Sequence, residues 1–319
     1  MTDILGHRSL QNLCLPIFSA PMFLVSGPEL VVASCHNNII GSFPAANART
    51  TGQLEDWLKE ITAKVDPKIH ASWAINLITN KLNKRLSDDL AITCQHKAPI
   101  VITALGHPGP VVEQVHAYGG LVFADVATVE QARKASKTGV DGLILIASGA
   151  GGHTGSICGF AFLAAVREFW PGLLVLGGAI SSGAGILASQ ILGADFAYMG
   201  TTFISSKESL AKPEYKAMLV NSVAKDIINT DAFTGIANNM LRPSIEKAGF
   251  DPDNIPRSAK SKLDFDDPHN GAKAWRDIWS AGHGVGEVKE ILTVKEIVAS
   301  LTTQYRQTLQ KHIINRSFT

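Results

Sequence analysis

A single histidine stands in a glycine-rich stretch whose residue types suit acid–base chemistry. The stretch SGAGGHTG covers residues 148–155 and has four glycines in eight residues around His153. Glycine loses much conformational entropy on folding, so such a cluster marks a sharp turn or a close approach of the backbone to another group. The pKa of an imidazole lies near neutrality, and His153 is therefore suited to take a proton from a substrate. The plainer alternative is that His153 only caps this loop.

Two later glycine-rich stretches suit the binding of a phosphate group. The stretches GGAISSG (177–183) and MGTTF (199–203) each stand at the end of a short apolar run. Backbone N–H groups at such positions can donate hydrogen bonds to phosphate oxygens. The candidate donors are Gly177, Gly178, Gly200 and Thr201. For each glycine alone, relief of crowding at a strand end is an equal alternative, whereas the two loops together predict a phosphate site.

A phosphorylated cofactor suits this phosphate site better than a nucleoside triphosphate. The sequence contains neither a Walker A motif nor the kinase motifs that accompany triphosphate binding. The stretch SAPM (19–22) ends an earlier apolar run and would form a wall for a flat ring. FMN combines a flat ring with one phosphate group, so it fits both features.

Eight repeats of one unit are expected to position these residues. Each unit is a short apolar run followed by an amphipathic segment of helical length, which predicts a parallel sheet covered by helices. The apolar runs cover residues 16–22, 39–45, 70–77, 98–105, 120–126, 142–148, 173–179 and 196–202. Eight such units in about 220 residues predict an α/β fold of the (β/α)8 TIM barrel type. An open doubly wound sheet is the alternative, but the first run lacks a GxGxxG turn and the glycine stretches come late in the chain.

The alternation of short apolar runs and helix-length segments ends at about residue 226. We therefore expect two parts, an FMN-binding barrel over residues 1–225 and an extension over residues 226–319 that packs on it. The extension offers turn residues and short helices with no clear strand period. The apolar spacing of Val294, Ile297, Val298 and Leu301 predicts a closing helix near its end.

Composition and charge favour a small-molecule partner. The 319 residues include 29 Lys and Arg and 28 Asp and Glu, which are scattered along the chain. This pattern predicts neither a nucleic-acid surface nor a basic membrane patch. Four separated cysteines without a CxxC pair, and a start without a signal-peptide pattern, lead us to expect a cytoplasmic protein with reduced thiols. The His, Asp and Glu residues show no HExxH-like spacing, so no metal site is predicted.

At this point the motifs resemble the nitronate monooxygenase family, formerly called 2-nitropropane dioxygenases, which are FMN-dependent barrels. The resemblance is carried by SAPMFLVS, INL, GAGGHTG, LGGAISSG and GADFAYMGTTFI, from about residue 16 to 205, with AFTGIANNMLRPSI and AWRDIWSAGHGVGEV beyond them. It implies that His153 is the active-site base or hydrogen-bond donor beside the flavin. It also implies cofactor contacts from Pro21, Met22, Asn76, Ser148, Ala150, Gly151, Gly178, Gly200 and Thr201. Gly177, from the phosphate loop, and Asp125, at the end of the fifth strand, complete the candidate cofactor-binding residues.

One position departs from the family pattern. Some members have a lysine near the end of the fifth strand, where this chain has Asp125 in FADVATVEQA. The departure puts the tuning of the flavin and the charge preference for substrates in question. His107 follows the fourth strand and could also face the pocket, although a loop histidine held by turn hydrogen bonds is the plainer interpretation. The resemblance alone would bring His283 over the flavin.

The activity implied by the resemblance is oxidation of nitronates or nitroalkanes with O2 to carbonyl compounds and nitrite. His153 would remove the proton from the carbon beside the nitro group or hold the resulting anion. One alternative is an NAD(P)H-dependent reductase of quinones or of enoyl-acyl carrier protein on the same FMN barrel. A second is a phosphate-binding barrel enzyme without redox chemistry. A homo-oligomer is left open.

Overall fold

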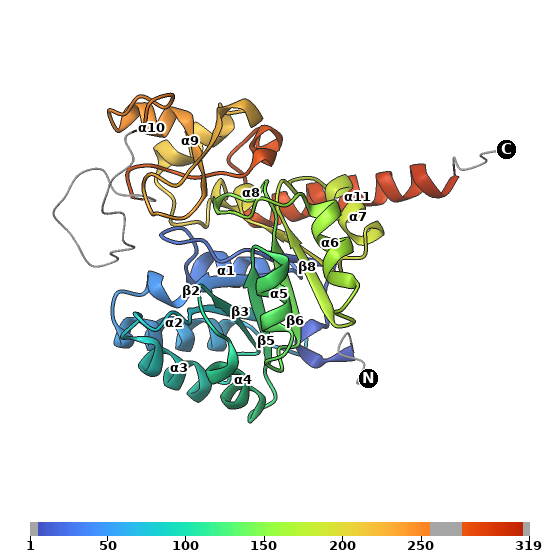
Figure 1. The fold of residues 1–319 in the computed structure, drawn as a ribbon. Helices are drawn as coiled ribbons and strands as arrows, with labels where there is room; N and C mark the ends of the chain where they lie inside the picture. Colours follow the sequence, from blue (N-terminus) through green and yellow to red (C-terminus); the bar gives the residue numbers. More distant parts are fainter. Residues whose placement is uncertain (1–5, 256–275, 315–319) are drawn as a thin grey trace.

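A closed barrel of eight parallel strands forms the centre of the molecule (Figure 1). The computed structural model describes residues 6–255 and 276–314. The barrel strands are β1 (Ile17–Ser19), β2 (Ile40–Pro44), β3 (Trp73–Ile78), β4 (Ile100–Ala104), β5 (Leu121–Val126), β6 (Gly142–Ile146), β8 (Leu173–Gly177) and β9 (Phe196–Met199). They pair in chain order, and β9 closes on β1. All eight predicted strands and the TIM barrel are thereby confirmed.

Alternation along the strands divides the core into two layers. Side chains at every second position point into the barrel, where Phe18, Ile102, Phe123 and Val175 pack in one buried cluster. Their neighbours along the strands point outward and pack under the helices, which explains why the runs are apolar at nearly every position. At the carboxyl ends of the strands, this inward face carries side chains that line a pocket.

Helices follow the strands and cover the barrel (Figure 1). They are α1 (Pro28–His36), α2 (Thr51–Lys64), α3 (Leu86–Gln95), α4 (Gly109–His116), α5 (Val129–Ala135), α6 (Gly159–Arg167), α7 (Gly183–Ile191), α8 (Thr201–Ile204) and α9 (Pro213–Val220), with 3-10 turns at Arg8–Leu10, Ala45–Asn47 and Ala224–Asp226. Several begin at side-chain caps, as the sequence predicts for α5, where Thr128 accepts a hydrogen bond from the amide of Gln131 at 3.1 Å.

The segment after residue 226 lies over one end of the barrel (Figure 1) and contains strands that the sequence did not predict. It comprises β10 (Ile227–Thr230), β11 (Asn238–Leu241), α10 (Arg242–Lys247), the 3-10 turn His283–Glu287 and α11 (Val294–Ile314). With β7 (Gly152–His153), strands β10 and β11 form a three-stranded antiparallel sheet. The expectation of turns and short helices alone was wrong, because these strands are short and one partner lies far away in the sequence.

The closing helix packs as expected, and Val294, Ile297, Val298 and Leu301 are buried on one face of α11. The boundary between two parts at residue 225 stays a prediction.

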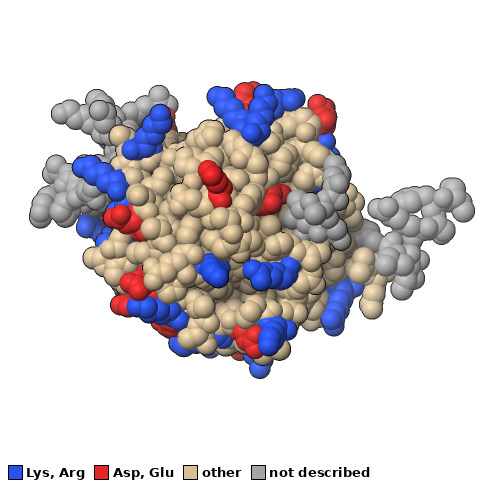
Figure 2. Space-filling model, turned by 90° about the horizontal axis from the view of Figure 1, so that it is seen from below, with Lys and Arg blue, Asp and Glu red and all other residues tan. Residues whose placement is uncertain are grey.

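Charged side chains are dispersed over the surface. On the face seen in Figure 2, basic and acidic residues are interspersed with uncharged ones, as their scatter in the sequence suggests. Among the described residues, no helix has the length and apolarity needed to cross a membrane. Residues 142–166 and 169–194 contain no Asp, Glu, Lys or Arg. They fold into β6 and β8 with the loops and helices that follow these strands.

Candidate active site

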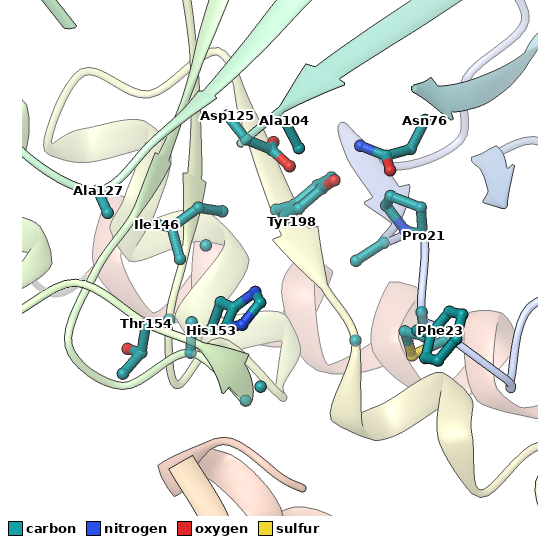
Figure 3. Close-up of a pocket in the computed structure, with 18 of the residues that line it drawn as sticks. Pro21, Phe23, Asn76, Ala104, Asp125, Ala127, Ile146, His153, Thr154 and Tyr198 are labelled. Atoms are coloured by element: carbon teal, nitrogen blue, oxygen red, sulfur yellow. The ribbon is translucent and has the colours of Figure 1, made fainter. Parts of the chain in front are cut away.

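A pocket of about 860 Å³ opens at the carboxyl ends of the barrel strands (Figure 3). This is the end at which barrels of this type carry their functional groups, and the volume lies in the range of small-molecule sites. Loops after β1, β4, β5, β6, β8 and β9 contribute to its wall. The segment around Ser280 and Gly282, from the C-terminal part of the chain, also lines it.

The loop after β6 brings His153 to this pocket. The loop leaves the barrel at Ile146 and continues into the short strand β7, where His153 pairs with Asn238 of β11. On the far side of His153, the hydroxyl of Thr154 donates to the carbonyl of Ala147 at 2.9 Å. His153 is half-buried and lines the pocket, so its backbone is fixed on both sides while its ring faces the cavity (Figure 3).

Asn239 on β11 ties the same loop to the C-terminal segment. Its side-chain amide donates to the carbonyl of Ser148 at 2.9 Å and to that of Ala150 at 2.7 Å. Its side-chain oxygen accepts from Asn229 of β10 at 3.0 Å. Asn239 is fully buried, and bonds of this kind are costly to break in a buried site. The conformation of the histidine loop therefore depends on residues about ninety positions later in the chain.

Gly151 is needed for the close packing of two segments of the protein backbone. A Cβ atom at Gly151 would lie 2.7 Å from the backbone nitrogen of Gly282 and 2.8 Å from the carbonyl carbon of Ala281. Only glycine allows two backbone segments to approach so closely. The sequence predicted a close approach here, and the structure identifies the C-terminal segment as one of the groups approached. The amide of Gly282 in turn donates to the hydroxyl of Thr201 at 2.9 Å.

Burial sets the charge of His153. Desolvation lowers the pKa of its imidazole to about 4, because a charged ring is poorly solvated in an apolar pocket. The ring is therefore neutral at physiological pH and has a nitrogen lone pair with which to accept a proton.

Asp125, Tyr198 and Asn76 lie together in the upper part of the view in Figure 3, with His153 below them and Ile146 to the left. They stand on β5, β9 and β3, each two positions beyond an inward-facing core residue. Asp125 Oδ1 and the Tyr198 hydroxyl are buried and make no hydrogen bond to any described residue. Burial raises the pKa of Asp125 to about 8. Burial, and then the charge of Asp125, raise the pKa of Tyr198.

Residues of the loops after β8 and β9 line the pocket, among them Gly178, Gly200 and Thr201. Gly178 has φ +135°, a conformation that side-chain-bearing residues rarely adopt. The backbone amides of Gly178, Gly200 and Thr201 donate no hydrogen bond to any residue within 6–255 and 276–314. These amides are suited to receive an anionic group of a ligand.

The structure brings nearly all of the predicted site residues together. Eleven of them line one pocket, namely Pro21, Met22, Asn76, Asp125, Ala150, Gly151, His153, Gly177, Gly178, Gly200 and Thr201. Ser148 does not line it, and its backbone instead bonds to Asn239 and Ile157. His107 lines the pocket, whereas His283 is exposed, and its backbone amide donates to the carbonyl of Gly149 at 3.1 Å.

Sequence reasoning missed Tyr198 and Asn239. Tyr198 had a usable signal, because it alternates with Phe196 along β9 and stands two positions before Gly200. Asn239 lies in the stretch AFTGIANNMLRPSI, but nothing near it in the sequence gave it a role, because its partners lie in a distant loop. In the described part of the chain, no group of three or more His, Cys, Asp or Glu side chains is placed to hold a metal ion.

Comparison with known proteins identifies close similarity to one family. The profile of the nitronate monooxygenase family matches residues 8–304. A nitronate monooxygenase of Paraburkholderia phytofirmans is 27% identical across 98% of both chains. Among solved structures, FabK from Thermotoga maritima superimposes with a TM-score of 0.77 at 22% identity, covering 94% of this chain and 96% of its own. Nitroalkane oxidase from Streptomyces ansochromogenes superimposes with a TM-score of 0.77 at 22% identity, covering 96% of this chain and 99% of its own. These two structural likenesses show the fold.

Proposed function

We propose, since this chain belongs to the nitronate monooxygenase family, that it binds FMN and oxidises nitronates or nitroalkanes with O2 to carbonyl compounds and nitrite. The observation that carries the proposal is one pocket that holds a neutral imidazole, a set of buried polar groups without protein partners and a set of free amides. Flavin, when bound, supplies the acceptance of electrons and the reaction with O2.

The residues of the pocket fit a flavin mononucleotide. The free amides of Gly178, Gly200 and Thr201 would hold the phosphate, and Pro21 and Met22 would border the ring. Asp125 Oδ1 and the Tyr198 hydroxyl are polar atoms that an apolar ligand would leave unsatisfied, at a cost of about 1–3 kcal/mol for each group. The side-chain amide of Asn76 already donates to the carbonyl of Ile102 at 3.3 Å, and its side-chain oxygen is offered to the ligand. The barrel has no dinucleotide-binding turn after its first strand, so the mononucleotide FMN is favoured over FAD.

His153 would act on the substrate as a base. Its neutral imidazole would accept the proton from the carbon beside a nitro group, and the imidazolium would then hold the resulting nitronate anion by a charge-assisted hydrogen bond. The pairing of β7 with β11 and the hydrogen bonds from Asn239 to Ser148 and Ala150 hold the loop that carries His153 in place. The loop therefore needs little ordering when substrate enters.

Release of the cofactor tests the FMN proposal. The purified protein is expected to be yellow and to give up its flavin on heating, because no covalent attachment is proposed. Chromatography of the supernatant should identify FMN. The preparation should also form nitrite and consume O2 with a primary nitroalkane. Recovery of FAD, or of no flavin, would overturn the proposal that the protein binds FMN. A colourless protein that binds a phosphorylated substrate would favour a barrel enzyme without redox chemistry.

A reductase on the same barrel is the second candidate, and the charge of the pocket suits its neutral substrates equally. Lys134 is the one lysine or arginine among the described residues that line the cavity, and it is exposed on α5. A site with few cations suits neutral substrates such as quinones as well as it suits neutral nitroalkanes. An NAD(P)H-dependent reductase of quinones or of enoyl-acyl carrier protein would use such a pocket. Cytoplasmic location and any homo-oligomer stay predictions.

A further inference from the structure

The polar end of the pocket is unusual among the inward-facing layers of the barrel. The layers below it are apolar, with Phe123 directly before Asp125 on β5 and Phe196 directly before Tyr198 on β9 along the inward face. The buried Oδ1 atom of Asp125 and the buried hydroxyl of Tyr198, which have no hydrogen-bond partner among the described residues, both destabilise the protein. Buried polar groups of this kind are retained where a ligand completes their hydrogen bonds.

The neighbours of Asp125 leave its carboxyl without a counter-charge. The titratable residues that line the pocket in the described part of the chain are His107, Lys134, His153, Tyr198 and Tyr215. The imidazole of His153 is neutral and lies below Asp125 in the view of Figure 3. Lys134 is exposed on α5, and Asp125 Oδ1 has no hydrogen-bond partner among the described residues. Desolvation therefore favours the protonated carboxyl and raises the pKa of Asp125 to about 8.

We propose that Asp125 receives the polar edge of the flavin ring as a neutral carboxylic acid beside the Tyr198 hydroxyl, and that its proton sets the pH dependence of the flavin midpoint potential. The inference rests on the proposed binding of FMN. The ring has one edge that carries carbonyl oxygens and ring nitrogens and one end that carries only methyl groups. The polar edge matches Asp125, Tyr198 and Asn76, and the methyl end matches the apolar wall that includes Met22, Val25 and Ile204.

The charge balance gives the direction of the effect. Two-electron reduction with uptake of one proton leaves the flavin ring with one negative charge. A neutral carboxyl donates a hydrogen bond to that charge, whereas a carboxylate repels it. At a pH where Asp125 is ionised in the oxidised protein, reduction must therefore take up a second proton, which goes to the carboxyl. The midpoint potential then falls more steeply with pH.

The test measures the midpoint potential of FMN-saturated protein between pH 6 and 10, by equilibration with a reference dye and a chemical reductant. Asp125→Asn keeps the shape and hydrogen bonding of the side chain but cannot ionise. Above the pH at which Asp125 ionises, the second proton should add a tenfold change in the reduction equilibrium constant for each pH unit in the parent protein. For a two-electron couple, this makes the slope of the midpoint potential steeper by about 30 mV per pH unit. Asp125→Asn should lose this additional slope.

Two further variants make the result specific. Glu113→Gln removes an exposed carboxylate on α4, outside the barrel, and should leave the potential profile as in the parent. Tyr198→Phe should weaken FMN binding by about 2- to 10-fold, the loss of one hydrogen bond, and keep the steep segment. Parallel profiles of the parent and Asp125→Asn over the whole range would overturn this inference while leaving FMN binding intact. Failure of the parent to bind FMN would instead overturn the proposed function.

Discussion

His153→Ala is expected to lower kcat/KM for a neutral nitroalkane by about 10²- to 10⁴-fold, the usual contribution of a positioned base. The preformed nitronate has already lost the proton, so its oxidation should suffer less. Measuring both substrates with the same preparation gives a ratio that does not depend on flavin content or on folding losses. The conservative variant His153→Gln keeps a hydrogen-bond donor without a base and should selectively spare the nitronate.

The same experiment has a matched control in the pocket. His107→Ala removes the other imidazole that lines the cavity and should leave the ratio of the two substrates unchanged. Equal losses with nitroalkane and nitronate in His153→Ala would mean that His153 acts through binding or orientation. No loss with either would return the histidine to a role in holding the loop.

The pH profile of the parent enzyme follows from the same residue. The base must be unprotonated, so kcat/KM for the neutral nitroalkane should fall as the pH is lowered through the pKa of His153. Burial places that pKa at about 4, so activity should be level across the range in which an exposed histidine titrates, near pH 6.5. A decline centred near pH 6.5 would show that the imidazole is solvated in the working enzyme.

The second large effect is expected from Gly200→Val. A Cβ atom at Gly200 would lie 3.5 Å from the sulfur of Met22 and 3.8 Å from Ala20 Cβ, which are ordinary contacts. The backbone at Gly200 has φ −103°, so the protein tolerates a side chain there while the pocket is narrowed. Overpacking of about 1–3 kcal/mol in the bound state predicts FMN binding weaker by roughly 5- to 150-fold.

The measurement is FMN per protein after dialysis, together with circular dichroism of the apoprotein. Gly52→Val is the matched control, because a Cβ atom at Gly52 on the outer helix α2 meets only Thr50 Oγ1 at 3.9 Å. Gly178→Val is a less useful variant, since φ +135° and a distance of 3.1 Å to Ala147 Cβ strain the fold as well. Full occupancy in Gly200→Val would remove this loop from the proposed cofactor site.

The sequence was sufficient for the barrel because the parallel strands are buried on both faces. An unbroken apolar run such as GLILI in β6 can be recognised without knowledge of its partners. The late position of the glycine loops then identified the end of the barrel that carries the pocket, and eleven predicted site residues meet there.

The sequence could not reveal how the histidine loop is held. Strand β7 has two residues, and it forms only because Asn238 and Asn239 of β11 pair with it. Neither segment has a hydrophobic period that would predict a strand. The glycine at 151 was recognisable as a point of close approach, but the partner at Gly282 is a tertiary contact. Asp125 shows the same limit, because its unusual protonation follows from burial and not from its neighbours in the chain.

Anaerobic mixing with a nitroalkane tests the central claim most directly. The claim is that this pocket holds a flavin and that His153 delivers the deprotonated substrate to it. Without O2, the neutral nitroalkane should bleach the visible flavin absorbance of the purified protein, and His153→Ala should slow that bleaching far more than the bleaching by the preformed nitronate. NADH and NADPH should leave the absorbance unchanged. Bleaching by NADH or NADPH but not by the nitroalkane would contradict the account and establish the reductase in its place.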